Sequence, residues 1–541
     1  MRPLPLALAL ALAAVPVSAQ RSDSATTYPI AGTIVAETSG QPLQRATVQI
    51  INTATGKHAQ STTSDEYGHF AFPAVPAGNY ILQGTTPGYL LTNYDDHDGY
   101  TTGIILPTSV DTQSLVLKLH PQGILTGTIL DENAEPVRQA NVRLFHQTHD
   151  FGDDRIVSAN AANTDDLGHF EIPRLAPGTY LLAVTATPWY AVHPMPPQPQ
   201  PRGFVQPYGF VDSIDPSLDV AYPTTYYPGT TDSSQAAPIL VRGGPVDISL
   251  RLAPEPALTL TLPFTPPKPG QAPQPMPQLR TSIFGQLQPV FQQEYRQSAN
   301  QITIAGLPAG DYVLSGNNQA ANTTTVHLTN QSTSADLPPN PNLVHVHVLL
   351  KTDDGVSVPP NMLVFLFKQN NSEPVLRVNS VKGEAKLDVP PGDYYFSLCT
   401  GQRHCFIRQI LAGDKPVANN IHLAGGPDPT FTIVFNIGTH TLRGVAQKDG
   451  KPAPGVLLLA FPSNELPQVR TFFRNQSDLD GSFDFKGLSP GAYTVVAIDN
   501  GWNLDWSREA VLSSYLAKAV SAQITAAETA TLATPIPVQP K

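Results

Sequence analysis

Residues 64–80 read SDEYGHFAFPAVPAGNY, and this stretch recurs along the chain. The second copy is TDDLGHFEIPRLAPGTY at 164–180, and the third is SDLDGSFDFKGLSPGAY at 477–493. Two shorter copies keep only the second half, IAGLPAGDY at 304–312 and LDVPPGDY at 387–394. A recurring unit of this kind is typical of an array of small modules.

The repeated stretch predicts two turns separated by a strand. Ser/Thr-Asp-x-x-Gly is a tight turn in which the Asp side chain bonds backbone N–H groups and Gly takes a positive φ. The alternating Phe-x-Phe/Ile places two large side chains on one strand face, and Pro-Gly or Pro-x-Gly makes the second turn. The following Tyr starts the next strand with its ring inward and its hydroxyl near the rim. The motif residues are Asp65, Gly68, Gly78 and Tyr80, then Asp165, Gly168, Gly178 and Tyr180, then Asp478, Gly481, Gly491 and Tyr493.

The whole chain has the composition of short strands joined by turns. It has 55 prolines and 39 glycines in 541 residues, and only 14% charged residues against a typical ~25%. Further strand-like segments precede each full copy, for example IAGTIV at 30–35 and ATVQI at 46–50. We predict an all-β fold, a tandem array of about five seven-stranded Greek-key sandwiches. One short helix is expected at 507–520, with a serine cap before Glu509.

These motifs resemble the carboxypeptidase regulatory-like domain, a transthyretin-like (prealbumin-like) sandwich related to the collagen-adhesin B-type repeats. The resemblance is good over 28–120, 121–186 and 438–500 and partial in between. It implies the fold, and the architecture is similar to that of exported proteins of soil bacteria. Some adhesin B-type relatives carry Lys–Asn cross-links, and we expect none here.

The repeat divides the chain into domains joined by short Pro-containing linkers. Such linkers are semi-rigid, so we expect a rod. The expected domains are a signal peptide at 1–19 and sandwiches at 28–120, 121–255 with an aromatic and Pro-rich insertion at 187–229, 256–338 in degenerate form, 339–437, and 438–541 with the C-terminal helix.

The N-terminus has the three parts of a signal peptide. Arg2 supplies a positive charge, 4–15 is an apolar run too short to span a bilayer, and small residues precede Ala19. We expect cleavage after Ala19 and a periplasmic or secreted protein that does not span the membrane. The two cysteines, Cys399 and Cys405, flank a polar turn and are expected to form a disulfide.

The residues contain no recognisable catalytic set. The net charge of −11 without a basic run argues against nucleic acid. His146 and His149 lack the Glu of a zinc peptidase, and the Asp-rich segments 95–99 and 478–481 favour turns over calcium loops. We therefore predict no enzyme, no cofactor and no metal.

The insertion at 187–229 concentrates aromatic residues on a loop. Such rings can stack on sugars or anchor a protein, or they can pack onto the sandwich edge between the second and third modules, which we favour. The candidate ligand-binding residues are Trp189, Tyr190, Tyr208, Tyr226 and Tyr227.

The sequence thus predicts a monomeric, non-catalytic binding or scaffolding protein of the bacterial cell envelope or exterior, with a protein partner. The alternatives are a carbohydrate-binding protein whose partner is a polysaccharide, and an accessory subunit of a secreted hydrolase.

Overall fold

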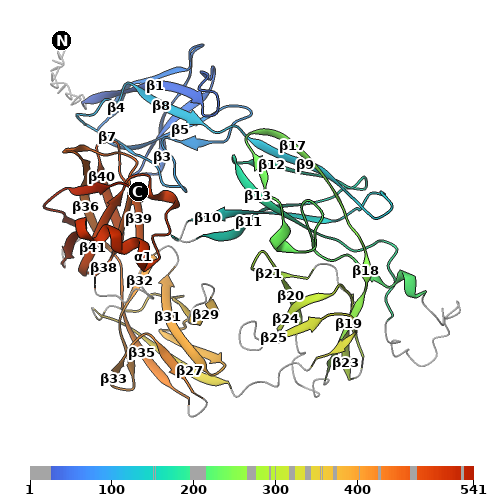
Figure 1. Cartoon of the computed structure of the whole chain (residues 1–541). Coiled ribbons are helices and arrows are strands. Elements are labelled where there is room, and N and C mark those ends of the chain that lie inside the picture. The colour runs from blue at the N-terminus through green and yellow to red at the C-terminus, as the bar shows by residue number, and fades with distance from the viewer. Residues whose placement is uncertain are drawn as a thin grey trace, which may run out of the picture.

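The computed structural model shows a chain built almost entirely of β-strands (Figure 1). Among the described residues, no helix is both long and apolar enough to cross a bilayer. The expected signal peptide lies outside the described residues. The structure describes 26–149, 152, 154–194, 215–264, 276–290, 294–298, 300–315, 323–335, 343–353, 355, 357–368, 374–400 and 403–424, 428–463, 472–525 and 529–541, with backbone alone at 374–375, 399–400 and 403–404.

The strands form because apolar residues alternate with polar ones. In β8 (Leu115–Leu119) the three leucines are buried, whereas Val116 and Lys118 between them are exposed. Successive side chains of a strand point to opposite faces, so each strand has one face to bury. Two sheets that share their buried faces form a sandwich.

Module 1 packs a three-stranded sheet, β4-β1-β8, against a second sheet, β3-β2-β5, which β6 and β7 extend at β5. Strand β1 pairs antiparallel with β4 and parallel with β8. Its strands are β1 (Thr27–Ala36), β2 (Thr47–Asn52), β3 (Lys57–Thr63), β4 (His69–Pro76), β5 (Gly78–Thr85), β6 (Thr92–Asn93), β7 (Ile104–Leu106) and β8.

Module 2 repeats this arrangement. Its sheets are β12-β9-β17 and β11-β10-β13, with β15 and β16 pairing with β13. Its elements are β9 (Gly123–Leu130), β10 (Asn141–Thr148), β11 (Arg155–Asn163), β12 (His169–Leu175), β13 (Gly178–Thr185), η1 (Pro216–Leu218), β14 (Val220–Ala221), β15 (Thr225–Tyr226), η2 (Ser233–Gln235), β16 (Ile239–Val241) and β17 (Gly244–Arg251).

Module 3 has two four-stranded sheets, β22-β23-β19-β26 and β21-β20-β24-β25, while β18 pairs back to β14 of module 2. Its strands are β18 (Glu255–Pro256), β19 (Leu258–Pro263), β20 (Gln278–Ile283), β21 (Gln286–Pro289), β22 (Glu294–Gln297), β23 (Gln301–Leu307), β24 (Gly310–Ser315), β25 (Thr323–Leu328) and β26 (Thr333–Ser334).

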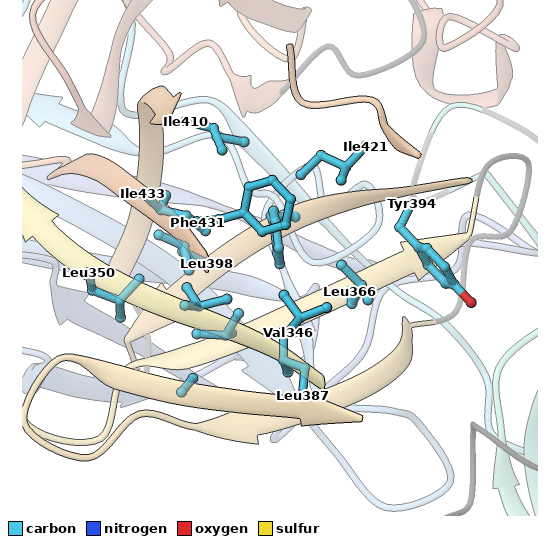
Figure 2. Packing of buried hydrophobic residues seen from close by; sticks show 14 of the residues in the cluster. Val346, Leu350, Leu366, Leu387, Tyr394, Leu398, Ile410, Ile421, Phe431 and Ile433 are labelled. Atoms are coloured by element: carbon cyan, nitrogen blue, oxygen red, sulfur yellow. The ribbon is translucent and has the colours of Figure 1, made fainter. Parts of the chain in front are cut away.

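Module 4 joins its two layers through the pair β31–β32. Figure 2 shows how side chains from both layers, such as Val346, Leu366 and Phe431, meet between the sheets. Its strands are β27 (Val344–Thr352), β28 (Leu363–Lys368), β29 (Pro374–Asn379), β30 (Glu384–Val389), β31 (Gly392–Thr400), β32 (Arg403–Ala412), β33 (Lys415–Val417), β34 (Ile421–Leu423) and β35 (Thr430–Ile437).

Module 5 completes the array. Strand β36 pairs with β40, β37, β43 and β44, and the second layer is β39-β38-β41-β42. Its elements are β36 (His440–Lys448), β37 (Lys451–Pro452), β38 (Leu457–Pro462), β39 (Phe473–Gln476), β40 (Ser482–Leu488), β41 (Gly491–Ile498), η4 (Gly501–Asn503), α1 (Glu509–Leu512), η5 (Ser513–Lys518), β42 (Val520–Ile524), β43 (Thr529–Thr531) and β44 (Ile536–Gln539).

The C-terminal helix exists but is shorter than expected, and its expected serine cap is wrong. The α-helix covers only Glu509–Leu512 before it tightens into the 3₁₀ turn η5. Arg508 occupies the N-cap position, and its side chain makes no capping hydrogen bond to the helix. The hydroxyl of Ser507 donates instead to the carbonyl oxygen of Gly152 in module 2, at 2.8 Å. A contact between modules has replaced a local cap.

The modules follow one another in a curve that brings module 5 back against module 1 (Figure 1). The expected rod is therefore wrong. Linker composition indicates how stiff a connection is, but side-chain contacts decide the direction in which it bends. We call the contact between modules 1 and 5 the closing interface.

Candidate functional site

The turn motif of modules 1 and 2 braces its own turn. Asp65 Oδ1 accepts hydrogen bonds from the backbone N–H groups of Tyr67 and His69, at 2.9 and 2.8 Å. Asp165 does the same in module 2. Gly68 has a φ of +76°, and a side chain there would meet the carbonyl oxygen of Ile34 at 2.6 Å. Only glycine fits that approach.

The motif tyrosine makes one hydrogen bond that recurs in all five modules. Its ring is buried, and its hydroxyl donates to the backbone carbonyl oxygen four residues earlier. This bond ties each strand start to the turn before it. The pairs are Tyr80 with Pro76, Tyr180 with Ala176, Tyr312 with Pro308, Tyr394 with Pro390, and Tyr493 with Ser489, at 2.7–3.1 Å.

The turn motif of module 5 contacts module 1 instead. Asp478 Oδ1 accepts the backbone N–H of Gly103 at 2.9 Å, and Oδ2 accepts the side-chain amide of Asn79 at 3.2 Å. The N–H of Leu479 donates to the carbonyl oxygen of Gly103 at 2.9 Å. Within the turn itself, Asp480 accepts the backbone N–H of Ser482.

Leu479 is the residue that distinguishes this turn. Its side chain is 6% exposed and belongs to the hydrophobic core of module 1. Glu66 and Asp166 occupy the same motif position in modules 1 and 2 and are exposed. An apolar residue at a position where the other two full copies carry an acid is the sequence signal for this interface.

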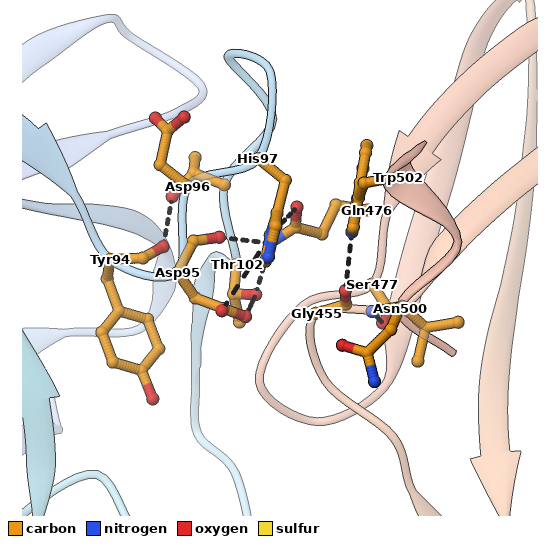
Figure 3. Close-up of polar contacts among 12 residues, drawn as sticks. Tyr94, Asp95, Asp96, His97, Thr102, Gly455, Gln476, Ser477, Asn500 and Trp502 are labelled. Carbon is orange, nitrogen blue, oxygen red and sulfur yellow. Dashed lines mark hydrogen bonds and ion pairs between the residues drawn. The ribbon is translucent and has the colours of Figure 1, made fainter. Parts of the chain in front are cut away.

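A buried glutamine extends the closing interface (Figure 3). Gln476 Nε2 donates to the carbonyl oxygen of Asp95 at 2.6 Å and to the hydroxyl of Thr102 at 2.8 Å. Its Oε1 lies 3.2 Å from Nδ1 of His97. A buried amide with all these partners specifies how the two surfaces dock.

Rings and charges complete the interface. The His97 ring stacks on the Trp502 ring, with centroids 5.1 Å apart and an interplanar angle of 5°. Arg474 of module 5 lies 3.5 Å from the carboxylate of Asp98 and over the ring of Tyr100, at 4.9 Å. Both Asp-rich segments therefore lie at this interface, as parts of turns.

Burial raises the pKa of Asp478 to about 7, chiefly because desolvation penalises the charged carboxylate. The neighbouring carboxylates Asp480 and Asp484 raise the pKa further, and the bonds from Gly103 and Asn79 lower it. The stability of the closing interface should therefore depend on whether the carboxyl group of Asp478 is protonated.

The predicted aromatic residues are distributed over different environments. Trp189 is 68% exposed, whereas Tyr190 is half-buried and donates its hydroxyl to Glu132. Burial and the Glu132 carboxylate raise the pKa of Tyr190 to about 12. Tyr208 lies outside the described residues.

Tyr226 supports the junction of modules 2 and 3, whereas Tyr227 packs within module 2. Tyr226 is buried and packs against Phe284 of module 3, with ring centroids 4.9 Å apart. Tyr227 is partly buried against the core of module 2. A cavity of about 270 Å³ lies beside this junction, lined among others by Arg143, Tyr226 and Tyr312.

Modules 1, 2 and 5 meet around a second cavity, of about 660 Å³, which His97, His146, His149, Trp502 and Lys541 help to line. At its edge, His149 lies near two carboxylates. Its Nε2 atom is 2.5 Å from Asp154 Oδ1 and 3.9 Å from Asp505 Oδ1. Local sequence patterns could not pair His149 with Asp505, because the two residues belong to different modules.

The expected disulfide remains a prediction. In the pairing of β31 with β32, the backbone of Cys399 lies opposite His404 rather than Cys405. The side chain of Cys399 is outside the described part, and Cys405 is partly buried against the core of module 4.

The comparisons with known proteins bear mainly on the first two modules. The family described as carboxypeptidase regulatory-like domain matches residues 29–104 and 124–193, so modules 1 and 2 carry this domain, as the resemblance implied. No curated protein matches.

Several solved structures are similar to the chain. The Bacillus anthracis TIE protein is 11% identical over 77% of this chain and 75% of its own, with a TM-score of 0.16. The shaft pilin SpaA from Lactobacillus rhamnosus GG is 14% identical over 42% and 98%, with a TM-score of 0.18. The minor pilin GBS52 of Streptococcus agalactiae is 14% identical over 45% and 100%, with a TM-score of 0.20. Similarities this weak carry nothing about function.

Proposed function

We propose that the chain is an exported, non-catalytic scaffold of the bacterial cell envelope or exterior that binds a protein partner. Its signal peptide would be cleaved after Ala19, and it would act as a monomer. Its units would be the modules at 28–120, 121–255, 256–338, 339–437 and 438–541.

The closing interface is the observation that carries this proposal. Asp478 and Gly103 are 375 residues apart in sequence, yet they share a partly buried hydrogen bond. A chain whose first and last modules hold each other keeps its exposed edges in fixed relative positions. A chain with fixed edges loses less conformational entropy of its own when a partner binds, which is what a scaffold supplies.

Solution scattering and crosslinking test this function together. The chain from Gln20 onward should scatter as a compact particle. In producing cells, tagged wild-type chain and the exposed-site control Leu167→Asp should crosslink to the same partner, and the interface variant Leu479→Asp should lose it. The proposal would be contradicted if the wild-type chain scattered as an extended particle. It would also be contradicted if Leu479→Asp, with the closing interface broken, still crosslinked to the partner.

One observation favours carbohydrate binding as a second candidate. The Trp189 ring is exposed and forms an edge-to-face contact with Tyr190, with centroids 5.8 Å apart and an interplanar angle of 89°, so a neighbouring ring holds an exposed aromatic side chain in place. A polysaccharide panel with Trp189→Ala tests it, and Leu240→Ala is an exposed control. Binding lost only in Trp189→Ala, at unchanged melting temperature, would support this candidate, and no binding by the wild type would dismiss it.

A further inference from the structure

Three metal-ligating side chains from two modules converge at the junction of modules 2 and 5. His149 directly follows β10 and Asp154 directly precedes β11, so both belong to one hairpin end. Asp505 lies between η4 and α1 of module 5. One potential ligand atom from each lies within 4.8 Å of the other two.

The backbone around this group is held in place from both sides. The N–H and the hydroxyl of Ser507 both donate to the carbonyl oxygen of Gly152, at 3.0 and 2.8 Å. The ring of Trp506 fills the space that a side chain on Gly152 would need, with its nearest atom 2.3 Å from the Cβ position. The hairpin end of module 2 is therefore fitted to module 5, which fixes the two halves of the ligand set relative to each other.

We propose that His149, Asp154 and Asp505 bind a divalent transition-metal ion of the zinc class. This goes beyond the proposed scaffold function, and it departs from the sequence-based expectation of no metal. One neutral imidazole and two carboxylates would neutralise the charge of a divalent ion. Three protein ligands with water in the fourth position is a common zinc arrangement.

The distances fit this chemistry after small side-chain movements. Zinc bonds to nitrogen and oxygen of about 2.0–2.2 Å place tetrahedral donor atoms roughly 3.3–3.6 Å apart. The 2.5 Å separation of His149 from Asp154 would open, and the 3.9 Å separation from Asp505 would close. Each of these two changes is about 1 Å or less, within the reach of a side-chain rotation, and the ligand atoms of Asp154 and Asp505 lie within 4.8 Å of each other. The side chains are 22–46% exposed, so an ion can enter from solvent.

The donor set favours zinc over calcium. Calcium takes six to eight oxygen ligands, whereas imidazole suits zinc, copper and nickel. Arg508 opposes the ion, because its guanidinium lies 3.1 Å from Asp505 Oδ2. An ion bound to Oδ1 would share this carboxylate with the guanidinium. The bound ion would link module 2 to module 5 and stiffen the curve of the array.

Titration of the metal-stripped chain, from Gln20 onward, with zinc chloride tests the site. Calorimetry should show a binding event with one ion per chain and a rise in melting temperature. Cobalt(II) should give the intense visible absorption of a four-coordinate site. His149→Ala and Asp505→Asn should each lower zinc affinity at least about tenfold, in line with the loss of a ligand.

A matched control separates this site from ordinary surface pairs. His327 and Asp311 form an exposed pair, at 2.6 Å, without a third ligand in the described structure. His327→Ala should leave zinc binding unchanged. The proposal is overturned if the wild type binds no zinc, or if zinc affinity is unchanged in His149→Ala and Asp505→Asn. Scattering of the zinc-free chain reports on closure separately, so the metal site and the scaffold function can fail independently.

Discussion

The turns at 64–70 and 477–483 have nearly the same sequence pattern but opposite uses. In module 1, the carboxylate of Asp65 accepts two N–H groups of its own turn and remains at the surface. In module 5, the carboxylate of Asp478 accepts hydrogen bonds from module 1, and Asp480 takes over the local role. The same local conformation can thus serve either folding or docking, and the neighbouring side chains decide which.

The difference depends on few residues. In the first copy, Glu66 is exposed to solvent. In the third copy, Leu479 places an apolar side chain in the core of module 1. Gln476 adds polar bonds that require one orientation. Hydrophobic burial supplies the driving force and the buried amide supplies the specificity.

The largest effect is expected when the apolar contact is removed. Leu479→Asp should destabilise the closing interface by about 3 kcal/mol or more, because it loses a buried leucine and places a carboxylate in an apolar core. The radius of gyration from scattering should increase, and hydrogen exchange at the amides of Gly103 and Leu479 should accelerate.

The matched control is Leu167→Asp, at an exposed position of the module 2 turn. It should change stability by less than about 0.5 kcal/mol and leave the scattering curve unchanged. If Leu479→Asp has the same scattering curve as the wild type, the closing interface does not hold the array together.

A second test uses pH. The pKa of Asp478 is raised to about 7 in the closed chain, and once solvated the group returns toward its ordinary pKa of 3.8. The closed form therefore binds more protons between these values, so closure should strengthen as pH falls from 8 toward 5. The slope is at most about 1.4 kcal/mol per pH unit for one group. Hydrogen exchange at the backbone amide of Gly103, followed as a function of pH, measures the free energy of this contact.

The Asp478→Asn variant sharpens this test. Asn79 Oδ1 is buried and has no hydrogen-bond partner in the described structure, so it can accept a hydrogen bond from protonated Asp478 or from an amide at that position. The variant should stay closed at pH 8 and lose the pH dependence. A slope that persists in Asp478→Asn would assign the titration to another group.

The sequence predicted the turns of modules 1 and 2 well because their chemistry is local, but the prediction was wrong for Asp478, whose carboxylate bonds module 1. An Asp that bonds N–H groups two and four residues ahead, and a Gly with positive φ, are encoded within five residues. The recurring tyrosine was placed correctly for the same reason, since its partner is a carbonyl group four residues away. The all-β tandem fold follows from this repetition.

Interactions between modules were beyond the reach of local reasoning. Ser507 has the spacing of a helix cap but bonds to Gly152, more than 350 residues away. Asp505 joins His149 only because the array curves. The curve itself arises from contacts that no linker composition encodes.

A smaller effect is expected from the turns that brace themselves. Asp65→Ala and Asp165→Ala should each lower the stability of their own module, because each removes a carboxylate that accepts two backbone N–H groups of its turn. Thermal unfolding with hydrogen exchange resolved by module should place each loss in module 1 or module 2. Closure measured by scattering should be unchanged in Asp165→Ala. If Asp165→Ala opens the array, the division between folding and docking turns is wrong.

The smallest effect is expected when the hydroxyl of a motif tyrosine is removed. Comparing this loss in modules 1 and 5 tests whether the two modules differ mainly in their Asp-containing turns. Tyr80→Phe removes one hydrogen bond to the carbonyl oxygen of Pro76 and should cost about 0.5–1 kcal/mol.

In module 5, the hydroxyl of Tyr493 also accepts the backbone N–H of Ser489, at 3.3 Å, and Ser489 is buried. Tyr493→Phe should therefore cost a few tenths of a kcal/mol more, because it leaves a buried donor unpaired. Both losses should appear as local destabilisation with closure intact. An open array in Tyr493→Phe would show instead that the closing interface depends on the rigidity of the whole β40–β41 turn.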